Sequence, residues 1–139
     1  VIPDRTDVEL DKVERVVVCS GKVYYDLTAA RTQYDVKNVA IVRLEQIYPF
    51  PYNDFNEVLS VYPNLEIVVW CQEEPKNQGA WYSGRHRIWR ELTRVKKGLE
   101  LLYAGRPPSA APAAGYMALH VAQQESLVMQ ALGLQDLDE

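Results

Sequence analysis

The sequence predicts an α/β domain with a mostly parallel central sheet and helices on both faces of that sheet. Four short runs rich in β-branched residues are the candidate strands: RVVVC (15–19), VAIVRL (39–44), LEIVVWC (65–71) and LELLYAG (99–105). These runs are continuously apolar rather than alternating, which is typical of strands covered on both faces. Segments with helical character separate them, and this strand–helix–strand spacing indicates parallel strands joined by crossover helices.

Three helices are expected between the strands and a fourth after them. The connecting segments are KVYYDLTAARTQYD (22–35), YNDFNEVLSVYP (52–63) and GAWYSGRHRIWRELTRVKK (79–97). The last helix is expected at about 116–132, with Gly133 as a stop signal. On this helix one face can hold Val121, Leu127, Val128, Ala131 and Leu132.

The chain divides into an extended arm, residues 1–14, and one α/β domain, residues 15–139. The arm contains Pro3 and a mixture of Asp and Val that gives no helical period. GRPPSAAPAAG (105–115) is expected to be an irregular loop because its prolines exclude regular structure. Since the first residue is Val rather than Met, we expect a fragment of a longer chain.

The composition limits the classes of function. A chain of 139 residues with 47% hydrophobic and 24% charged residues is typical of one soluble globular domain. Its net charge of −4 argues against nucleic-acid binding, and its apolar runs are far shorter than the roughly 20 residues of a membrane span. Cys19 and Cys71 lack the spacing of a metal site, so we expect no metal and two free, buried thiols.

The polar residues gather where the predicted strands end. In an open parallel sheet, ligands bind beyond the carboxyl ends of the strands. Ser20, Gly21 and Lys22 follow the first strand, where Ser20 could cap the helix, Gly21 allow close approach and Lys22 add charge. This is a candidate anion-binding corner, although it lacks the pattern of a phosphate-binding P-loop. A strand-to-helix turn that uses Ser-Gly for its geometry alone is the alternative.

WCQEEPKNQGAWYSGRHR (70–87) is the densest polar stretch of the chain. Glu73 and Glu74 are adjacent on an extended segment, so their side chains diverge, and we expect them to organise this edge rather than act as a catalytic pair. The spacing of Trp81, Arg85 and Trp89 suggests a stacked packing face. The alternative is a phosphate or nucleotide site built on the arginines.

Two other features are interpreted as surface or interface residues. YPFP (48–51) holds its backbone extended, and we expect Tyr48, Pro49 and Phe50 to expose apolar surface that packs against another chain or domain. His120, on the last helix, is expected to be an exposed or interface residue rather than a catalytic base.

Six segments together resemble one known domain. They are VIPD, VERVVVCSGKVYYDL, VAIVRLEQIYPFP, YPN, WCQEEPKNQGAWY and YAGRPPSAAPAAGYMALHVAQQ. In this order they closely resemble the carboxyl-terminal domain of the thiamine-diphosphate-dependent 2-oxoglutarate dehydrogenase component, which has a transketolase-like fold. The resemblance covers essentially the whole chain, and QEEPKNQGAW and YAGRPPSAAPAAGY are its most specific parts. The segment between Gly84 and Gly98 matches no familiar pattern.

The resemblance implies an activity for the whole enzyme rather than for this piece. That enzyme is a homodimer that decarboxylates 2-oxoglutarate with thiamine diphosphate and Mg²⁺, then passes the succinyl group to dihydrolipoyl succinyltransferase in the tricarboxylic acid cycle. The thiamine-binding GDG motif is absent here, so we expect no catalytic residue and no activity in the fragment. Alternatives are a purely architectural, dimer-holding module, or a relative that uses 2-oxoadipate or pyruvate.

The resemblance also implies a possible regulatory site. In some relatives this domain holds an effector, AMP or acetyl-coenzyme A. Ser20, Gly21 and Lys22 match the corner that the family would use, and Gln78, Arg85, Arg87 and Arg106 could complete it by position. The expected location is the bacterial cytoplasm in preference to the mitochondrial matrix, and not outside the cell.

Overall fold

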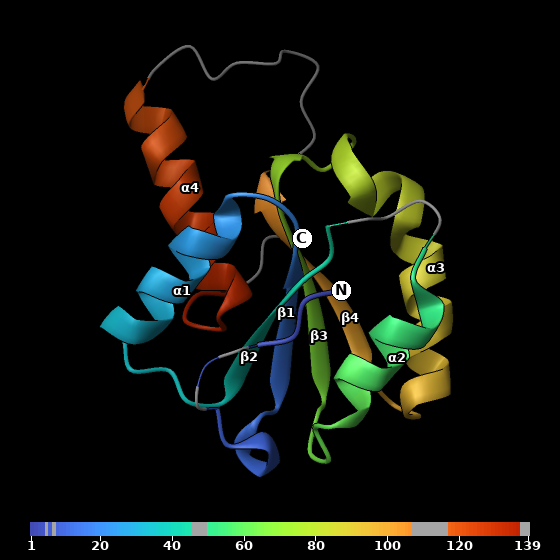
Figure 1. The fold of residues 1–139 in the computed structure, drawn as a ribbon. Coiled ribbons are helices and arrows are strands. Elements are labelled where there is room, and N and C mark those ends of the chain that lie inside the picture. The colour runs from blue at the N-terminus through green and yellow to red at the C-terminus, as the bar shows by residue number, and fades with distance from the viewer. Residues whose placement is uncertain (5, 7, 46–49, 107–116, 137–139) are drawn as a thin grey trace.

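The computed structural model describes residues 1–136 except 5, 7, 46–49 and 107–116, and residues 117–120 only through their backbone. The sheet contains four parallel strands, β1 (Arg15–Cys19), β2 (Val39–Arg43), β3 (Ile67–Pro75) and β4 (Glu100–Arg106), in the order β2-β1-β3-β4. The helices are α1 (Val23–Gln33), α2 (Tyr52–Ser60), α3 (Gly79–Val95) and α4 (Met117–Ala131). The predicted fold class is confirmed, and every predicted strand and helix is present within a few residues of its expected bounds (Figure 1).

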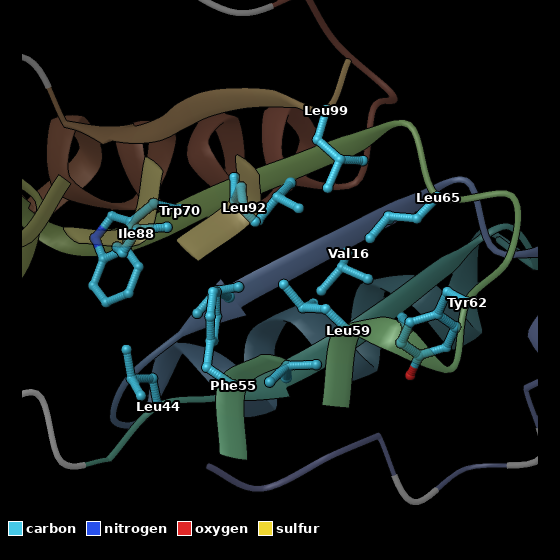
Figure 2. Packing of buried hydrophobic residues seen from close by; sticks show 14 of the residues in the cluster. Val16, Leu44, Phe55, Leu59, Tyr62, Leu65, Trp70, Ile88, Leu92 and Leu99 are labelled. Carbon is cyan, nitrogen blue, oxygen red and sulfur yellow. The ribbon is translucent and has the colours of Figure 1, made fainter. Parts of the chain in front are cut away.

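Each face of the sheet is covered by two helices, because successive side chains of a strand point to opposite faces. Val16 and Val18 of β1 pack in one cluster with α2 and α3, whereas Val17 and Cys19 pack in a second cluster with α1 and α4. Figure 2 shows the first cluster, in which Phe55 of α2 and side chains of α3 lie against the sheet. Burial on both faces explains why the strands read as continuous apolar runs.

The strand order places the carboxyl ends of β1 and β3 at a switch in the topology. From β1 the chain crosses to β2 on one side, and it later returns to β3 on the other side of β1. The helices that follow β1 and β3 cover opposite faces of the sheet. This is the position at which open α/β sheets bind ligands, so the polar residues after β1 and β3 lie where a site is expected.

Two helix faces differ from the sequence prediction. On α3 the buried residues are Trp81, Gly84, Ile88, Glu91 and Leu92, whereas Trp89 is 49% exposed. The expected packing face of Trp81, Arg85 and Trp89 is therefore wrong, because eight residues of helix turn the last member about 80° away from the first. Near α4, Leu127, Val128, Ala131 and Leu132 are buried as predicted, but Val121 is 47% exposed. Its position six residues before Leu127 places it on another side of the helix.

The N-terminal segment is attached to the sheet. Ile2 forms an antiparallel bridge with Arg43 at the end of β2, and Val13 is fully buried. Between them a short 3₁₀-helix, η1 (Leu10–Lys12), interrupts the extended backbone that the sequence predicted for residues 1–14. The division into an arm and a domain stays a prediction.

Asp4 anchors this segment through a buried ion pair with Arg31 of α1. The side chains of Asp4 and Arg31 are only 3% and 8% exposed. The carboxylate of Asp4 also accepts hydrogen bonds from the backbone N–H groups of Ile41 and Thr6, at 2.8 and 2.9 Å. Burial raises the pKa of Asp4, but the hydrogen bonds from Arg31, Thr6 and Ile41 lower it more, so the net shift is downward.

Cys19 and Cys71 are free and buried, as predicted, on neighbouring strands. Burial raises the pKa of Cys19 to about 12 and raises the pKa of Cys71 well above its ordinary value. Both thiols are therefore protonated and unreactive at neutral pH. Within the described ranges, none of the helices has the length and apolar character needed to cross a membrane.

We expect Asp4→Asn to lower the free energy of unfolding of the chain by about 3–5 kcal/mol, because it leaves the charge of Arg31 buried without a partner. Since the pKa of Asp4 is lowered in the folded state, this stabilisation is complete above the ordinary value of 3.8 and is lost as the pH falls below it. Urea unfolding at pH 7 and pH 3 measures both effects. Asp35→Asn is the control, because its ion pair with Lys37 is exposed. Equal losses for both variants would contradict a structural role for the buried pair.

Candidate functional site

A polar network joins four elements at the carboxyl edge of the sheet. Arg106 at the end of β4 donates from Nη1 to the backbone oxygen of Glu73 at 2.7 Å, and from Nη2 to Oε1 of Gln124 at 2.8 Å. Gln124, on α4, donates from Nε2 to the carboxylates of Glu73 and of Asp26 on α1, at 2.9 and 2.8 Å. One amide and one guanidinium therefore tie β3 and β4 to both helices that cover one face.

The turn between β1 and α1 has free space beside its backbone. Gly21 has φ +80°, a conformation that favours glycine, and a Cβ built there would meet no atom within 4 Å. α1 begins at Val23, with Lys22 as its N-cap and no side-chain cap. The expectation that Ser20 caps this helix is wrong, because Gly21 and Lys22 separate Ser20 from the first helical residue. The first turn of α1 thus keeps N–H groups that no side chain caps.

Carboxylates face this corner. Oε1 of Glu45 lies 3.4 Å from the N–H nitrogen of Gly21 and 3.1 Å from Nε of Arg43. Oε2 of Glu73 lies 4.0 Å from Nζ of Lys22, whose side chain is 82% exposed. Since Lys22 and the helix start attract negative charge, these two acids occupy the surroundings that a bound anion would use.

The structure brings together only part of the predicted effector set. Lys22 and Arg106 each contact Glu73, Lys22 at its carboxylate and Arg106 at its backbone oxygen. Gln78 is exposed at the start of α3, and its backbone oxygen accepts a hydrogen bond from Gln72. Arg85 is exposed on α3, and no hydrogen bond or ion pair between described residues connects it to Lys22 or Arg106. The effector role of these residues stays a prediction.

The predicted interface residues are only partly described. Phe50 is 6% exposed, and its ring packs at 5.5 Å from that of Phe55 in the core, so the expectation that it exposes apolar surface is wrong. The reason is that Phe50 lies two residues before α2, whose packing on the sheet places the ring in the same core cluster. Tyr48 and Pro49 lie outside the described residues, as do the loop 107–116 and the side chain of His120.

Gln72 of β3 is the main residue that sequence reasoning missed. Its side chain is buried and its Oε1 accepts hydrogen bonds from Nε1 of Trp70 at 2.9 Å and from the backbone N–H of Trp81 at 3.1 Å. Its Nε2 donates to the backbone oxygens of Pro75 and Gln78, at 3.0 and 2.8 Å. The bond to the N–H of Trp81 caps the first turn of α3. The N-cap residue Gln78 provides no side-chain cap of its own. The sequence did contain a signal for this role, because Gln72 is a polar residue at the end of an apolar strand, two residues after Trp70.

Two glycines pack closely against Gln72 and its neighbours. Gly79 has φ +68°, and a Cβ built there would lie 3.1 Å from Oε1 of Gln72 and 3.2 Å from Oε2 of Glu74. A Cβ on Gly105 would lie 2.8 Å from the backbone oxygen of Gln72, closer than real Cβ contacts. The neighbouring Tyr103 donates from its hydroxyl to the backbone oxygen of Arg106 at 3.0 Å, and burial raises its pKa to about 12. At Gly105 a side chain would therefore collide with Tyr103 and with the backbone of Gln72, whereas at Gly79 the positive φ and the tight contact with the Gln72 amide both favour glycine.

The arrangement supports organisation of the edge rather than catalysis. Glu73 contacts Lys22 and Gln124, whereas the carboxylate of Glu74 lies beside Gly79, so the two acids do not share one site. Among the described residues, no group of three His, Cys, Asp or Glu side chains is placed to hold a metal ion.

We expect Gly79→Ala to destabilise the chain more than Gly98→Ala. Both glycines have positive φ, +68° and +86°, but a Cβ at Gly98 would meet no atom within 4 Å. Gly98→Ala should cost about 1–2 kcal/mol from the backbone alone, and Gly79→Ala about 1–3 kcal/mol more from crowding the Gln72 amide. Thermal and urea unfolding of both variants measure the difference. Equal losses would mean that the amide moves aside freely.

Comparison with known proteins identifies the domain. Residues 1–132 match the family model described as 2-oxoglutarate dehydrogenase C-terminal. Over 131 residues the chain is 53% identical to the 2-oxoglutarate dehydrogenase E1 component of Azotobacter vinelandii, covering 94% of this chain and 14% of that protein. It is 43% identical over 122 residues to the mitochondrial 2-oxoglutarate dehydrogenase of Schizosaccharomyces pombe, covering 88% of this chain and 12% of that protein.

A solved structure shares the fold. It is described as a split-gene transketolase, inactive β4 tetramer, and it aligns with a TM-score of 0.59 and 14% identity over 87% of this chain and 40% of that one. At this identity the similarity concerns the fold alone, and it confirms the predicted transketolase-like architecture. The family match covers nearly the whole chain, arm included, and the chain belongs to the 2-oxoglutarate dehydrogenase C-terminal family.

Proposed function

We propose that this chain is the structural carboxyl-terminal domain of a 2-oxoglutarate dehydrogenase E1 component. The match of residues 1–132 to the family carries this proposal. The chain spans about one-seventh of the length of its E1 relatives, so catalysis belongs to the longer protein. That protein would decarboxylate 2-oxoglutarate with thiamine diphosphate and Mg²⁺ and transfer the succinyl group to the lipoyl group of dihydrolipoyl succinyltransferase.

The internal contacts of the domain support a structural role. Glu73, Arg106 and Gln124 bond to one another, and the described residues offer no metal-ligating cluster. We therefore assign thiamine diphosphate and Mg²⁺ to the rest of the protein. The partners of this domain would be the remaining domains of the same chain and the second copy of a homodimer. Since the bacterial relatives reach the higher identities, we expect it in the bacterial cytoplasm.

Turnover by the full-length protein tests this assignment. With thiamine diphosphate, Mg²⁺ and a lipoyl-bearing succinyltransferase, we expect kcat/KM for 2-oxoglutarate to exceed that for 2-oxoadipate and pyruvate by at least tenfold. The 139-residue chain alone should turn over none of the three. A preference for 2-oxoadipate or pyruvate would move the protein to a relative with another substrate, and turnover by the chain alone would overturn the structural role.

A second candidate function is the binding of an anionic effector, AMP or acetyl-coenzyme A, at Ser20, Gly21 and Lys22. The open space over Gly21, beside the uncapped start of α1 and the exposed Lys22, favours it. The corner also lies at the switch in strand order, where open α/β sheets bind ligands. A phosphate group there would have to displace the carboxylates of Glu45 and Glu73.

Lys22→Ala in the full-length enzyme tests the effector site. We expect the concentration of AMP or acetyl-coenzyme A that gives half-maximal response to rise about tenfold, because one charge-assisted contact is lost. Titration of activity against each effector, with inorganic phosphate as a third ligand, measures this. Lys37→Ala is the matched control, since Lys37 precedes β2 at the opposite end of the sheet. An unchanged response to every ligand in Lys22→Ala would leave the domain with a purely architectural role.

A further inference from the structure

A pocket of about 660 Å³ lies between the start of α2 and the second half of α3. The pocket is open to solvent, so it is a surface hollow rather than an enclosed cavity. Its walls include Phe50, Tyr52 and Asp54 from the segment that begins α2, and Arg90, Glu91 and Arg94 from α3. α2 and α3 cover the face of the sheet opposite to α1 and α4, so this pocket is separate from the corner at Lys22.

Glu91 is a buried carboxylate that lacks sufficient donors. The residue is 3% exposed, and Oε1 accepts only a long hydrogen bond, 3.5 Å, from Nδ2 of Asn56. Oε2 is buried and accepts no hydrogen bond from any described residue. The nearest cation, Nη1 of Arg94, lies 3.7 Å away, beyond hydrogen-bond distance. A buried carboxylate oxygen without a donor is costly, so Glu91 points to a donor that arrives from the pocket.

Two arginines on the same helix as Glu91 suit an anion. Arg90 and Arg94 are four residues apart on α3, so they lie on the same side of the helix. The backbone oxygen of Arg90 accepts a hydrogen bond from the hydroxyl of Thr93, but its guanidinium makes no hydrogen bond or ion pair with a described residue. The nine-residue helix α2 begins at Tyr52, and its N-cap Pro51 has no side-chain cap. Two guanidinium groups beside an uncapped helix start are typical of phosphate and carboxylate binding.

The charges around the pocket define the ligand further. Arg90 and Arg94 are balanced by Glu91 and Asp54, so the charged walls are formally neutral. A bare anion would satisfy the arginines but would leave Oε2 of Glu91 without a donor. A water molecule would satisfy Glu91 but would not use the arginines. A ligand with an anionic group and a hydrogen-bond donor satisfies both the arginines and Glu91.

We propose that this pocket binds a small phosphate or carboxylate that carries a neighbouring hydroxyl or ammonium group. Arg90 and Arg94 hold the anionic group, and the carboxylate of Glu91 accepts the hydrogen of the donor. The rings of Phe50 and Tyr52, which pack at 5.0 Å from one another, form the apolar wall beside the carbon frame of the ligand.

Isothermal titration of the full-length protein with matched probes tests the proposal. The probes are glycerol 3-phosphate, O-phosphoethanolamine and glycerate, each of which has an anion and a donor, with inorganic phosphate and glycerol as the single-group controls. We expect at least one of the first three to bind at least tenfold more tightly than either control. The phosphate and carboxylate probes distinguish the two anions, and the hydroxyl and ammonium probes distinguish the two donors. Equal affinity for inorganic phosphate, or no binding of any probe, would overturn the proposal.

Variants assign the binding to this pocket. Arg90→Gln should weaken every anionic probe about tenfold. Glu91→Gln keeps the shape of the side chain, and it should remove most of the advantage that the donor-bearing probes have over inorganic phosphate. Lys97→Gln, which removes a cation just beyond α3, should change nothing. Because Arg90 is exposed, its variant remains informative even where Glu91→Gln lowers the melting temperature. Binding that is lost in Lys22→Ala but retained in Arg90→Gln would place the ligand at the other corner and overturn the proposal.

Discussion

The side-chain amide of Gln72 holds the end of β3, the loop after it and the start of α3 in one arrangement. Both of its polar atoms are used, Oε1 by Trp70 and the backbone of Trp81, and Nε2 by backbone oxygens of the loop. The pairing of β3 with β4 is irregular between Gln72 and Pro75, where the strand departs from its register. A buried amide that loses its partners is costly. A change in the loop or in the start of α3 would therefore leave the Gln72 amide with unsatisfied atoms.

The polar network at the carboxyl edge of the sheet depends on this arrangement. The irregular end of β3 presents the backbone oxygen of Glu73 to Arg106 and its carboxylate to Gln124 and Lys22. Through Gln124 the same network reaches Asp26 of α1. Acids, amides and basic residues at this edge therefore form a hydrogen-bond network that joins strands to helices. Part of the polar composition of residues 70–87 is therefore explained by contacts that join strands to helices.

The sequence was sufficient for the fold because burial on both faces leaves a direct record in continuous apolar strands. It was insufficient wherever a side chain is satisfied by distant backbone atoms. Gln72 bonds to carbonyl groups of an irregular loop, and Asp4 bonds to Arg31 and to the N–H of Ile41. Neither set follows a spacing rule. Phe50 was misjudged for a related reason, since only the position of α2 on the sheet shows that the ring faces the core.

Among the buried side-chain oxygens of the described residues, only Oε2 of Glu91 lacks a hydrogen-bond partner, although the buried indole nitrogen Nε1 of Trp81 lacks one too. The carboxylate of Asp4 receives hydrogen bonds from Arg31, from both groups of Thr6 and from Ile41, and the amide of Gln72 uses both ends. Glu91 is buried to a similar extent, yet one oxygen has a single long bond and the other has none from the described residues. Burial alone therefore does not explain it, because the same chain provides donors for its other buried acceptors. What distinguishes Glu91 is that it lines a pocket, and a donor supplied through that pocket accounts for both the burial and the missing bond.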